Sequence, residues 1–455
     1  MKRLLIANRG EIALRIIRSA RALGIETIAV FSEADKDAAH VAAADHAVFL
    51  GPAPARESYL ATEKVLAAAK SAGADAIHPG YGFLSENDVF AKTVTDAGMI
   101  WVGPGPDALR NMGDKDRARA LAKAAGVPVV PGSARFAEGE LEGAEQAAEC
   151  LGYPLLVKAS AGGGGIGMRR VDAPDSLADT IRSTQSMAKR AFGDGTVFLE
   201  RYVPHARHIE IQVFGFGNGE AVHLFERDCS LQRRFQKIVE ESPAPRLSDS
   251  VRTAMADAAL ALCRATRYSS AGTVEFIFDV DSNEFYFLEM NTRIQVEHPV
   301  TEMVTGQDLV AMQLKFASGT LTGLEQSEVA SKGHSIQCRL YAENPEKKFF
   351  PSPGPLNVFR LPEQSQNLRI DCGYRQGDTI TPHYDPMLAK IIAWGANRQA
   401  ACDLAAQALQ QVRVEGIVTN RDFLLACIED PEFRAGNVHT GFVDEFGKRA
   451  ASAAE

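Results

Sequence analysis

The segment Glu289-Met-Asn-Thr-Arg-Ile-Gln-Val-Glu297 alternates polar and mostly apolar side chains along its whole length. Successive side chains of an extended chain point to opposite faces, so one face would carry every odd-numbered polar group. The alternation therefore predicts a β-strand with a continuous polar face. A solvated edge strand has the same pattern, so the neighbouring sequence must decide between a solvated face and a functional one.

The sequence just before this segment predicts its partner strand. The turn Asp281-Ser282-Asn283 separates two runs too apolar for an exposed hairpin. Pairing about Ser282 places Glu275 directly opposite Glu289. Like charges that face each other across strands are destabilising unless something neutralises them. A hard cation can do so, because carboxylates and the amide oxygen of Asn291 suit Mg²⁺ (or Mn²⁺). We therefore predict a metal site here.

The first hundred residues predict a doubly wound parallel α/β sheet. Short apolar runs alternate with helical stretches at residues 12–23 and 59–69, which is the pattern of βαβ units. The first strand-to-helix turn reads Asn8-Arg9-Gly10-Glu11 rather than G-x-G-x-x-G, so a dinucleotide site is not supported. The predicted strands are residues 4–7, 27–31, 47–50, 76–78 and 100–102.

The rest of the chain predicts two further lobes without a low-complexity linker. A helix at 114–125 is followed, over 155–202, by a strand, a glycine run, a helix and another strand. Beyond this segment an antiparallel sheet is expected, and then a C-terminal α+β lobe. The predicted strands of the sheet are 209–216, 273–280 and 284–290; those of the last lobe are 335–341 and 388–393, with a helix at 398–412.

Composition excludes several classes of protein. The 455 residues are 45% hydrophobic and 24% charged, which is typical of a globular protein with several domains. No apolar run approaches the roughly 18 residues that span a bilayer. A net charge of −9 argues against nucleic-acid binding. The seven cysteines form no C-x-x-C pair, which suggests reduced thiols. We expect a cytoplasmic protein that binds no membrane.

Five motifs, in family order, resemble the biotin carboxylase family of the ATP-grasp superfamily. They are I-A-N-R-G-E-I-A at 6–13, H-P-G-Y-G-F-L-S-E-N at 78–87, M-G-D-K at 112–115, R-D-C-S-L-Q-R-R at 227–234 and E-M-N-T-R-I-Q-V-E-H-P-V-T-E at 289–302. The resemblance implies an N-terminal biotin carboxylase domain at 1–113 and an ATP-grasp domain at 114–330, with a mobile glycine-flap lid over about 131–203. A C-terminal biotin carboxylase domain at 331–447 follows.

The resemblance also implies a nucleotide site. Glycines permit close backbone approach to phosphates and expose N–H donors to them. Lys158 ends an apolar run, where a lysine can aim its ammonium into a cleft. By similarity, Glu275, Glu289 and Asn291 hold the metal ions. The residues expected around ATP are Lys115, Lys158, Gly163, Gly164, Gly165, Glu200, Val203, His208, Glu275 and Glu289.

A second implied site handles bicarbonate and biotin. By similarity, bicarbonate is held by Lys237, Arg293, Gln295 and the backbone of Val296. A guanidinium can hold such an anion bidentately. Glu297 corresponds to the general base that deprotonates bicarbonate for attack on ATP, which forms carboxyphosphate. Carboxyphosphate would then yield CO₂, and phosphate would take the proton from biotin N1. Arg339 matches the arginine that stabilises the resulting ureido anion.

Two residues depart from the family pattern, and both fall near the nucleotide. Ile166 stands where the family usually has Arg or Lys, and Phe235 stands where it usually has His. These changes predict an altered ATP affinity, and they leave the metal and bicarbonate positions unchanged. Two other functions stay open. One is a different ATP-grasp ligase, such as a carbamoyl-phosphate or purine-pathway enzyme. The other is a weakly active scaffold subunit.

The sequence contains no Glu-Ala-Met-Lys-Met-like biotinylation segment and no carboxyltransferase region. We therefore expect a separate biotin carboxyl carrier protein and a carboxyltransferase subunit as partners, and a homodimer as in the family. Residues 339–345 look somewhat more like acyl-CoA or urea carboxylases than the bacterial acetyl-CoA type. The expected enzyme is a ligase that forms a C–N bond on biotin.

Overall fold

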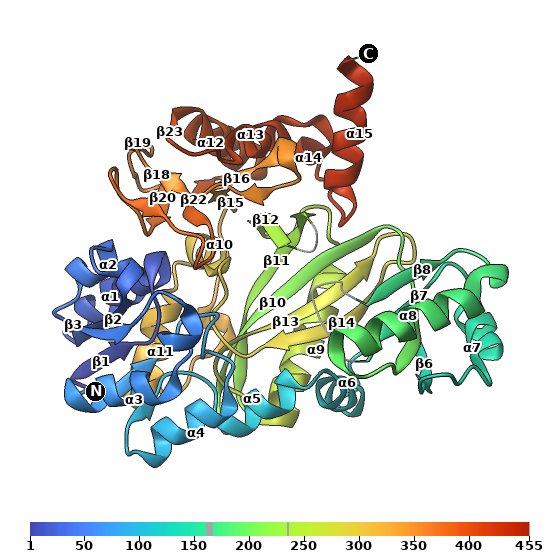
Figure 1. Ribbon diagram of the computed structural model, residues 1–455, viewed down its shortest axis with the longest axis horizontal. Helices are drawn as coiled ribbons and strands as arrows, with labels where there is room; N and C mark the ends of the chain where they lie inside the picture. The colour runs from blue at the N-terminus through green and yellow to red at the C-terminus, as the bar shows by residue number, and fades with distance from the viewer. Residues whose placement is uncertain (161–166, 234–235, 455) are drawn as a thin grey trace.

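The computed structural model describes residues 1–160, 167–233 and 236–454. Its N-terminal lobe lies at one side of the molecule and a small sheet with two helices at the other (Figure 1). A long sheet runs between them, and the C-terminal lobe lies above it in this view. Within the described residues, no helix is both long and apolar enough to cross a membrane.

The N-terminal lobe is a doubly wound parallel sheet, as predicted. Its strands follow the order β3-β2-β1-β4-β5, and neighbours pair in parallel. Leu4, Leu5 and Ile6 are all fully buried, because helices cover both faces of a parallel sheet. The elements are β1 (Arg3–Ile6), α1 (Gly10–Ala22), β2 (Glu26–Ser32), α2 (Ala39–Ala43), β3 (His46–Gly51), α3 (Thr62–Ser71), β4 (Ala76–His78), α4 (Asp88–Asp96), β5 (Ile100–Trp101) and α5 (Pro106–Gly113).

The central sheet is antiparallel and has the order β14-β13-β10-β11-β12-β15-β22-β20. Its strands are β10 (Ala206–Phe216), β11 (Ala221–Arg233), β12 (Gln236–Ser242), β13 (Ser269–Asp279), β14 (Glu284–Asn291), β15 (His334–Tyr341), β20 (Leu368–Cys372) and β22 (Met387–Gly395). The pairing of β12 with β15 joins the central and C-terminal lobes into one sheet. This continuity is not evident from the sequence, because other helices and strands lie between β12 and β15 along the chain.

The small sheet has the order β6-β9-β7-β8 and packs against two helices. Its core includes Leu155, Val157, Ile181 and Leu199, all fully buried. The elements are β6 (Gly132–Phe136), α7 (Ala144–Leu151), β7 (Leu155–Ala159), β8 (Met168–Val171), α8 (Leu177–Phe192) and β9 (Val197–Arg201). This agrees with the strand, helix and strand expected over 155–202. The predicted glycine flap falls mostly on residues 161–166, outside the described residues.

The remaining helices and strands complete the central and C-terminal lobes. The helices are α6 (Lys115–Ala124), α9 (Asp249–Thr266), α10 (His298–Thr305), α11 (Leu309–Ala317), α12 (Arg398–Gln411), α13 (Arg421–Glu429), α14 (Pro431–Ala435) and α15 (Phe442–Ala454). Short strands are β16 (Glu343–Asn344), β17 (Phe350–Pro351), β18 (Gly354–Pro355), β19 (Val358–Arg360), β21 (Thr379–Ile380) and β23 (Arg413–Glu415). Short 3₁₀ helices lie at Glu33–Asp35, Ala55–Glu57, Pro174–Ser176, Gln326–Glu328 and Pro345–Lys347.

The polar strand predicted over 289–297 is wrong beyond its first third. Strand β14 ends at Asn291, whose last partner is Thr273. The next six residues, 292–297, form a loop that leads into α10, with Glu297 as its N-cap. Pro299 explains the change, because proline is favourable in the first turn of a helix and cannot donate to a sheet ladder. We call residues 292–297 the junction loop.

Candidate active site

Four charged side chains form a row across neighbouring strands of the central sheet. Glu210 on β10 is directly opposite Arg227 on β11 and Glu275 on β13, and Glu275 is directly opposite Glu289 on β14. The predicted pairing of Glu275 with Glu289 is therefore confirmed. It depends on a β-bulge, because Phe276 pairs with Phe287 and leaves Leu288 as the extra residue.

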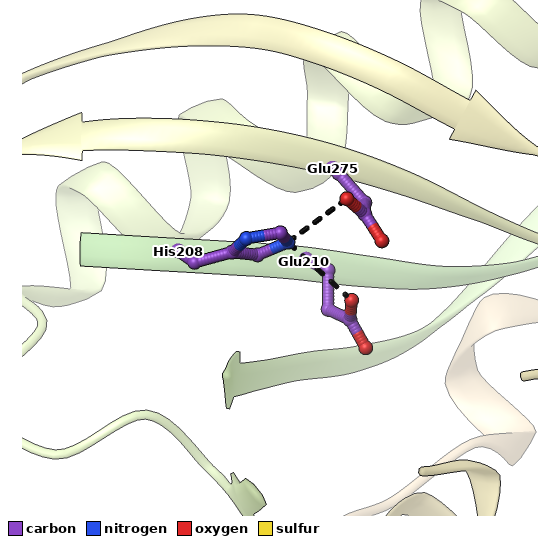
Figure 2. Close-up of side chains that lie close together, drawn as sticks. All are labelled: His208, Glu210 and Glu275. Carbon is purple, nitrogen blue, oxygen red and sulfur yellow. Dashed lines mark ion pairs between the residues drawn. The ribbon is translucent and has the colours of Figure 1, made fainter. Parts of the chain in front are cut away.

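Glu275 is the most heavily contacted carboxylate of this row. Its Oε1 accepts hydrogen bonds from Asn291 Nδ2 (2.8 Å), Gln295 Nε2 (2.8 Å) and Lys237 Nζ (2.9 Å). Its Oε2 lies 2.9 Å from Nε2 of His208, and Figure 2 shows this ring directed at the carboxylates of Glu275 and Glu210. Burial alone would raise the pKa of Glu275, but the Lys237 and His208 charges hold that pKa well below its usual range.

Glu289 has the opposite environment. Its side chain is 38% exposed, and its ion pair with Lys115 is long, at 3.8 Å. Burial and the charge of Glu275 raise the pKa of Glu289. Two facing carboxylates, one of them poorly neutralised, fit a divalent cation, because hard cations prefer such oxygens. The third expected ligand, Asn291, lies beside Glu275 and accepts a 2.8 Å hydrogen bond from Arg293 through Oδ1.

Lys237 on β12 connects this row to the predicted base. Besides Glu275, its ammonium contacts Oε2 of Glu210 at 2.7 Å and Oε1 of Glu297 at 2.6 Å. The other oxygen of Glu297 accepts a 3.0 Å hydrogen bond from Arg339. Burial would raise the pKa of Glu297, but Lys237 and Arg339 hold it below its usual range. Glu297 is therefore ionised at neutral pH, as a general base must be.

The junction loop brings the other predicted bicarbonate residues to the same place. Gln295 is buried and donates to Glu275, while its Oε1 accepts from Arg227 at 2.7 Å. Arg293 donates to Asn291 and forms a 3.0 Å ion pair with Glu86. The carbonyl oxygen of Val296 accepts a 3.2 Å hydrogen bond from Lys390 of the C-terminal lobe. Arg293, Gln295 and Glu297 thus all contact Lys237 or the residues around Glu275, but a loop rather than an alternating strand brings them there.

The predicted nucleotide residues are divided between two sheets. His208 belongs to the carboxylate row, whereas Lys158 on β7 donates to Glu200 on β9 at 2.6 Å, in the small sheet. Val203 is buried just after β9, and Lys115 lies at the start of α6 with most of its side chain exposed. The remaining expected residues Gly163, Gly164 and Gly165, and both departures from the family pattern, Ile166 and Phe235, lie outside the described residues.

Two kinds of residue at this site were not predicted from the sequence. Glu210 and Arg227 are fully buried and form an ion pair at 2.5 Å. The alternation in His208-Ile-Glu-Ile-Gln-Val213 is a signal that could have revealed Glu210. Glu240 on β12, which pairs with Arg339, has no such signal. Its role depends on the β12–β15 pairing, which only the folded chain shows.

A sheet with paired carboxylates, next to a smaller α/β lobe with a lysine–glutamate pair, defines an ATP-grasp protein. Family models support this class. Residues 1–109 match "Biotin carboxylase, N-terminal domain", residues 114–324 match "Carbamoyl-phosphate synthase L chain, ATP binding domain", and residues 337–445 match "Biotin carboxylase C-terminal domain". Biotin carboxylase 1 of Bacillus subtilis is 49% identical, with 98% of this chain and 99% of the relative covered. The chain therefore belongs to the biotin carboxylase family, which confirms the resemblance.

Two other relatives extend the comparison. The mitochondrial methylcrotonoyl-CoA carboxylase subunit alpha of Arabidopsis thaliana is 48% identical over 98% of this chain, which spans 60% of that relative's length. A solved structure of the biotin carboxylase domain of Hydrogenobacter thermophilus 2-oxoglutarate carboxylase has a TM-score of 0.90. It is 41% identical, and 98% of this chain and 97% of that chain are covered.

Proposed function

We propose that this chain uses ATP and bicarbonate to carboxylate biotin carried by a separate protein. The observation that carries this proposal is the placement of Glu297 between Lys237 and Arg339, at contact distances of 2.6 and 3.0 Å. An ionised carboxylate next to two cations suits a base that must work on a small anion. The junction loop connects Glu297 to β14, where Glu289 and the facing Glu275 form a carboxylate pair of the kind that binds a metal and nucleotide phosphates.

In the proposed reaction, Lys237, Arg293, Gln295 and the backbone of Val296 hold bicarbonate. Glu297 takes the bicarbonate proton, and a bicarbonate oxygen attacks the γ-phosphorus of ATP. The bond to the departing ADP breaks, and carboxyphosphate forms. Carboxyphosphate then splits into CO₂ and phosphate. The phosphate takes the proton from biotin N1, and N1 attacks CO₂ to form carboxybiotin.

The charges around Glu297 explain how one carboxylate can be both ionised and basic. Lys237 and Arg339 are fully engaged with carboxylates in the described structure. Bicarbonate would share these cations, so each would stabilise Glu297 less and its pKa would rise. A base is most effective when its pKa approaches the working pH. Once Glu297 is protonated, Arg339 is available to stabilise the negative charge that develops on the biotin ureido oxygen.

The nucleotide and metal assignments belong to the same proposal. Glu275, Glu289 and Asn291 would hold Mg²⁺ (or Mn²⁺), which when bound neutralises charge on the ATP phosphates. Further contacts to ATP would come from Lys115, Lys158, Gly163, Gly164, Gly165, Glu200, Val203 and His208. The solved 2-oxoglutarate carboxylase domain supports this, because that structure is a complex with MgADP, ADP and bicarbonate. We also propose domain limits at 1–113, 114–330 and 331–447.

The proposed partners are a biotin carboxyl carrier protein and a carboxyltransferase subunit, in a cytoplasmic carboxylase. Relatives named as methylcrotonoyl-CoA carboxylase alpha subunits support an acyl-CoA as the final acceptor, and the likeness of residues 339–345 to urea carboxylases keeps urea in the same proposal. A homodimer is proposed because the 2-oxoglutarate carboxylase domain is described as a dimer.

Transfer of labelled bicarbonate to biotin tests the proposal. The purified chain is incubated with ATP, Mg²⁺, ¹⁴C-bicarbonate and free biotin, and acid-labile label on biotin is measured together with ATP hydrolysis. We expect both to depend on biotin and to be lost in Glu297→Gln, which should still bind ADP by calorimetry. ATP turnover that ignores biotin would indicate another ATP-grasp ligase. A chain that binds no nucleotide would be a scaffold, and either result refutes the proposal.

A further inference from the structure

One buried lysine contacts the backbone of the junction loop next to the predicted base, Glu297. Lys390 lies on β22 and is 0% exposed. Its ammonium donates a 3.2 Å hydrogen bond to the carbonyl oxygen of Val296. It also lies 2.9 Å from Oε2 of Glu11 and 3.7 Å from Oδ2 of Asp371. The two carboxylates offset the cost of burying the lysine charge, but they do not account for its hydrogen bond to Val296.

The groups around Lys390 come from all three lobes of the chain. Glu11 is on α1 of the N-terminal lobe, Asp371 is on β20 of the C-terminal lobe, and Val296 belongs to the central junction loop. Arg369 extends the connection, because it binds Asp371 and also donates to Glu302 of α10 at 2.6 Å. Lys390 therefore binds the junction loop while its ammonium is held by carboxylates of the N-terminal and C-terminal lobes.

The sheet register places Lys390 beside the predicted catalytic arginine. Lys390 is directly opposite Arg339 on β15 and Asp371 on β20, so the three side chains lie in one row on one face. Arg339 holds the carboxylate of Glu297, and Lys390 holds the carbonyl of the residue just before it. Two neighbouring cations thus hold two consecutive residues of the loop.

We propose that Lys390 is a positioning residue that aims Glu297 at bicarbonate; this inference rests on the proposed function. A hydrogen bond to the Val296 carbonyl fixes the plane of the peptide that links Val296 to Glu297. No strand ladder can fix this plane, because residues 292–297 lie outside β14. Misplacement of a reacting group by about 1 Å can lower the rate about 100-fold. The lysine therefore acts through Glu297 and does not touch bicarbonate.

The main test is the double variant K390M/E11Q. Methionine removes the donor while keeping much of the volume, and glutamine removes the carboxylate that would otherwise be left unpaired. Asp371 keeps Arg369 as its partner. We expect kcat for biotin- and bicarbonate-dependent ATP hydrolysis to fall about 10- to 100-fold. The KM for ATP and the calorimetric Kd for ADP should change less than about twofold, since the nucleotide contacts are on other strands.

Two control variants distinguish a role in positioning Glu297 from a role that only stabilises the contact between lobes. E11Q alone keeps the Lys390 donor and should retain kcat within about threefold of the wild type. R398M/E241Q removes another ion pair between lobes, at 2.6 Å, which joins α12 of the C-terminal lobe to β12 of the central lobe and does not contact the junction loop. It should lower the unfolding temperature to a similar degree and leave kcat unchanged. If K390M/E11Q does not fold, K390L/E11Q, which also lacks a donor to Val296, takes its place, and the same fall in kcat is expected.

The outcomes distinguish this inference from the function on which it rests. A wild-type chain without biotin-dependent bicarbonate turnover refutes the proposed function. If the wild type is active and both Lys390 variants match the R398M/E241Q control in kcat, the positioning role is refuted and Lys390 only joins the lobes. A fall in kcat that is accompanied by an equal rise in the KM for ATP also refutes it, because the defect would then reach the nucleotide site.

Discussion

Glu210→Gln is the most informative perturbation of the carboxylate row. Glu210 is fully buried and pairs with Arg227 at 2.5 Å and with Lys237 at 2.7 Å. Glutamine keeps the shape and can still accept a hydrogen bond, so the variant removes the charge with little change in packing. We expect a loss of local stability and a loss of the placement of Lys237.

The magnitude follows from the two ion pairs. Unit charges 2.7 Å apart attract by roughly 6 kcal/mol at an effective dielectric constant of about 20. Removing one partner of a buried pair costs about 3–5 kcal/mol net. Lys237 keeps Glu275 and Glu297 as partners, so we take the lower value, about 3 kcal/mol. With one anion fewer, Lys237 should move toward Glu297, and kcat/KM for bicarbonate should fall about 100-fold.

Hydrogen exchange measures the local effect, because a chain of several lobes need not unfold in one step. Protection of amides in β10 and β12 should fall about 100-fold in E210Q, which corresponds to about 3 kcal/mol. Glu226→Gln is the matched control, since Glu226 is also fully buried, precedes Arg227 on the opposite face of β11, and pairs with Arg252 at 2.7 Å. It should lose protection locally and keep the bicarbonate KM. Unchanged protection and kinetics in E210Q would refute the reasoning.

Three further predictions concern the metal, the nucleotide and pH. Glu275→Gln should weaken Mn²⁺ binding about tenfold or more in an electron-paramagnetic-resonance titration, because it removes one hard ligand. Lys158→Met should raise the KM for ATP about tenfold or more without changing the KM for bicarbonate, because a charged hydrogen bond is worth roughly 1.5–3 kcal/mol. Burial alone would raise the pKa of Glu241, but Arg398 and His334 lower it from 4.5 to about 2. A depressed carboxyl pKa stabilises the fold above pH 4.5, so about 3 kcal/mol should be lost between pH 4.5 and 2. Thermal unfolding of E241Q should lack this acid-sensitive component.

Local patterns in the sequence predicted much of the fold and part of the site. The strands and helices of the N-terminal lobe follow from short apolar runs that alternate with helical periodicity. The turn at 281–283 predicted which carboxylates face each other, because a hairpin is a local structure. Its agreement with the structure also required the bulge at Leu288, which no turn signal indicates.

Contacts between distant segments were beyond the sequence patterns. Glu240 reaches Arg339, and Lys390 reaches Val296 and Glu11, only after β12, β15 and β22 have paired. A polar residue in a strand gives no sign of which partner strand will face it. These residues therefore looked like ordinary members of strands in the sequence.

The segment 289–297 shows both sides of this division. Its carboxylates and amide, with Glu275 opposite, predicted a metal, and the family resemblance added the prediction of a small anion beside it. Tertiary structure decided how they converge. The strand ends at Asn291, and a loop held by Arg339 and Lys390 turns the remaining groups inward. The physical reason is that alternation fixes only which face a side chain takes in an extended chain, whereas the path of a loop depends on charges supplied by distant segments.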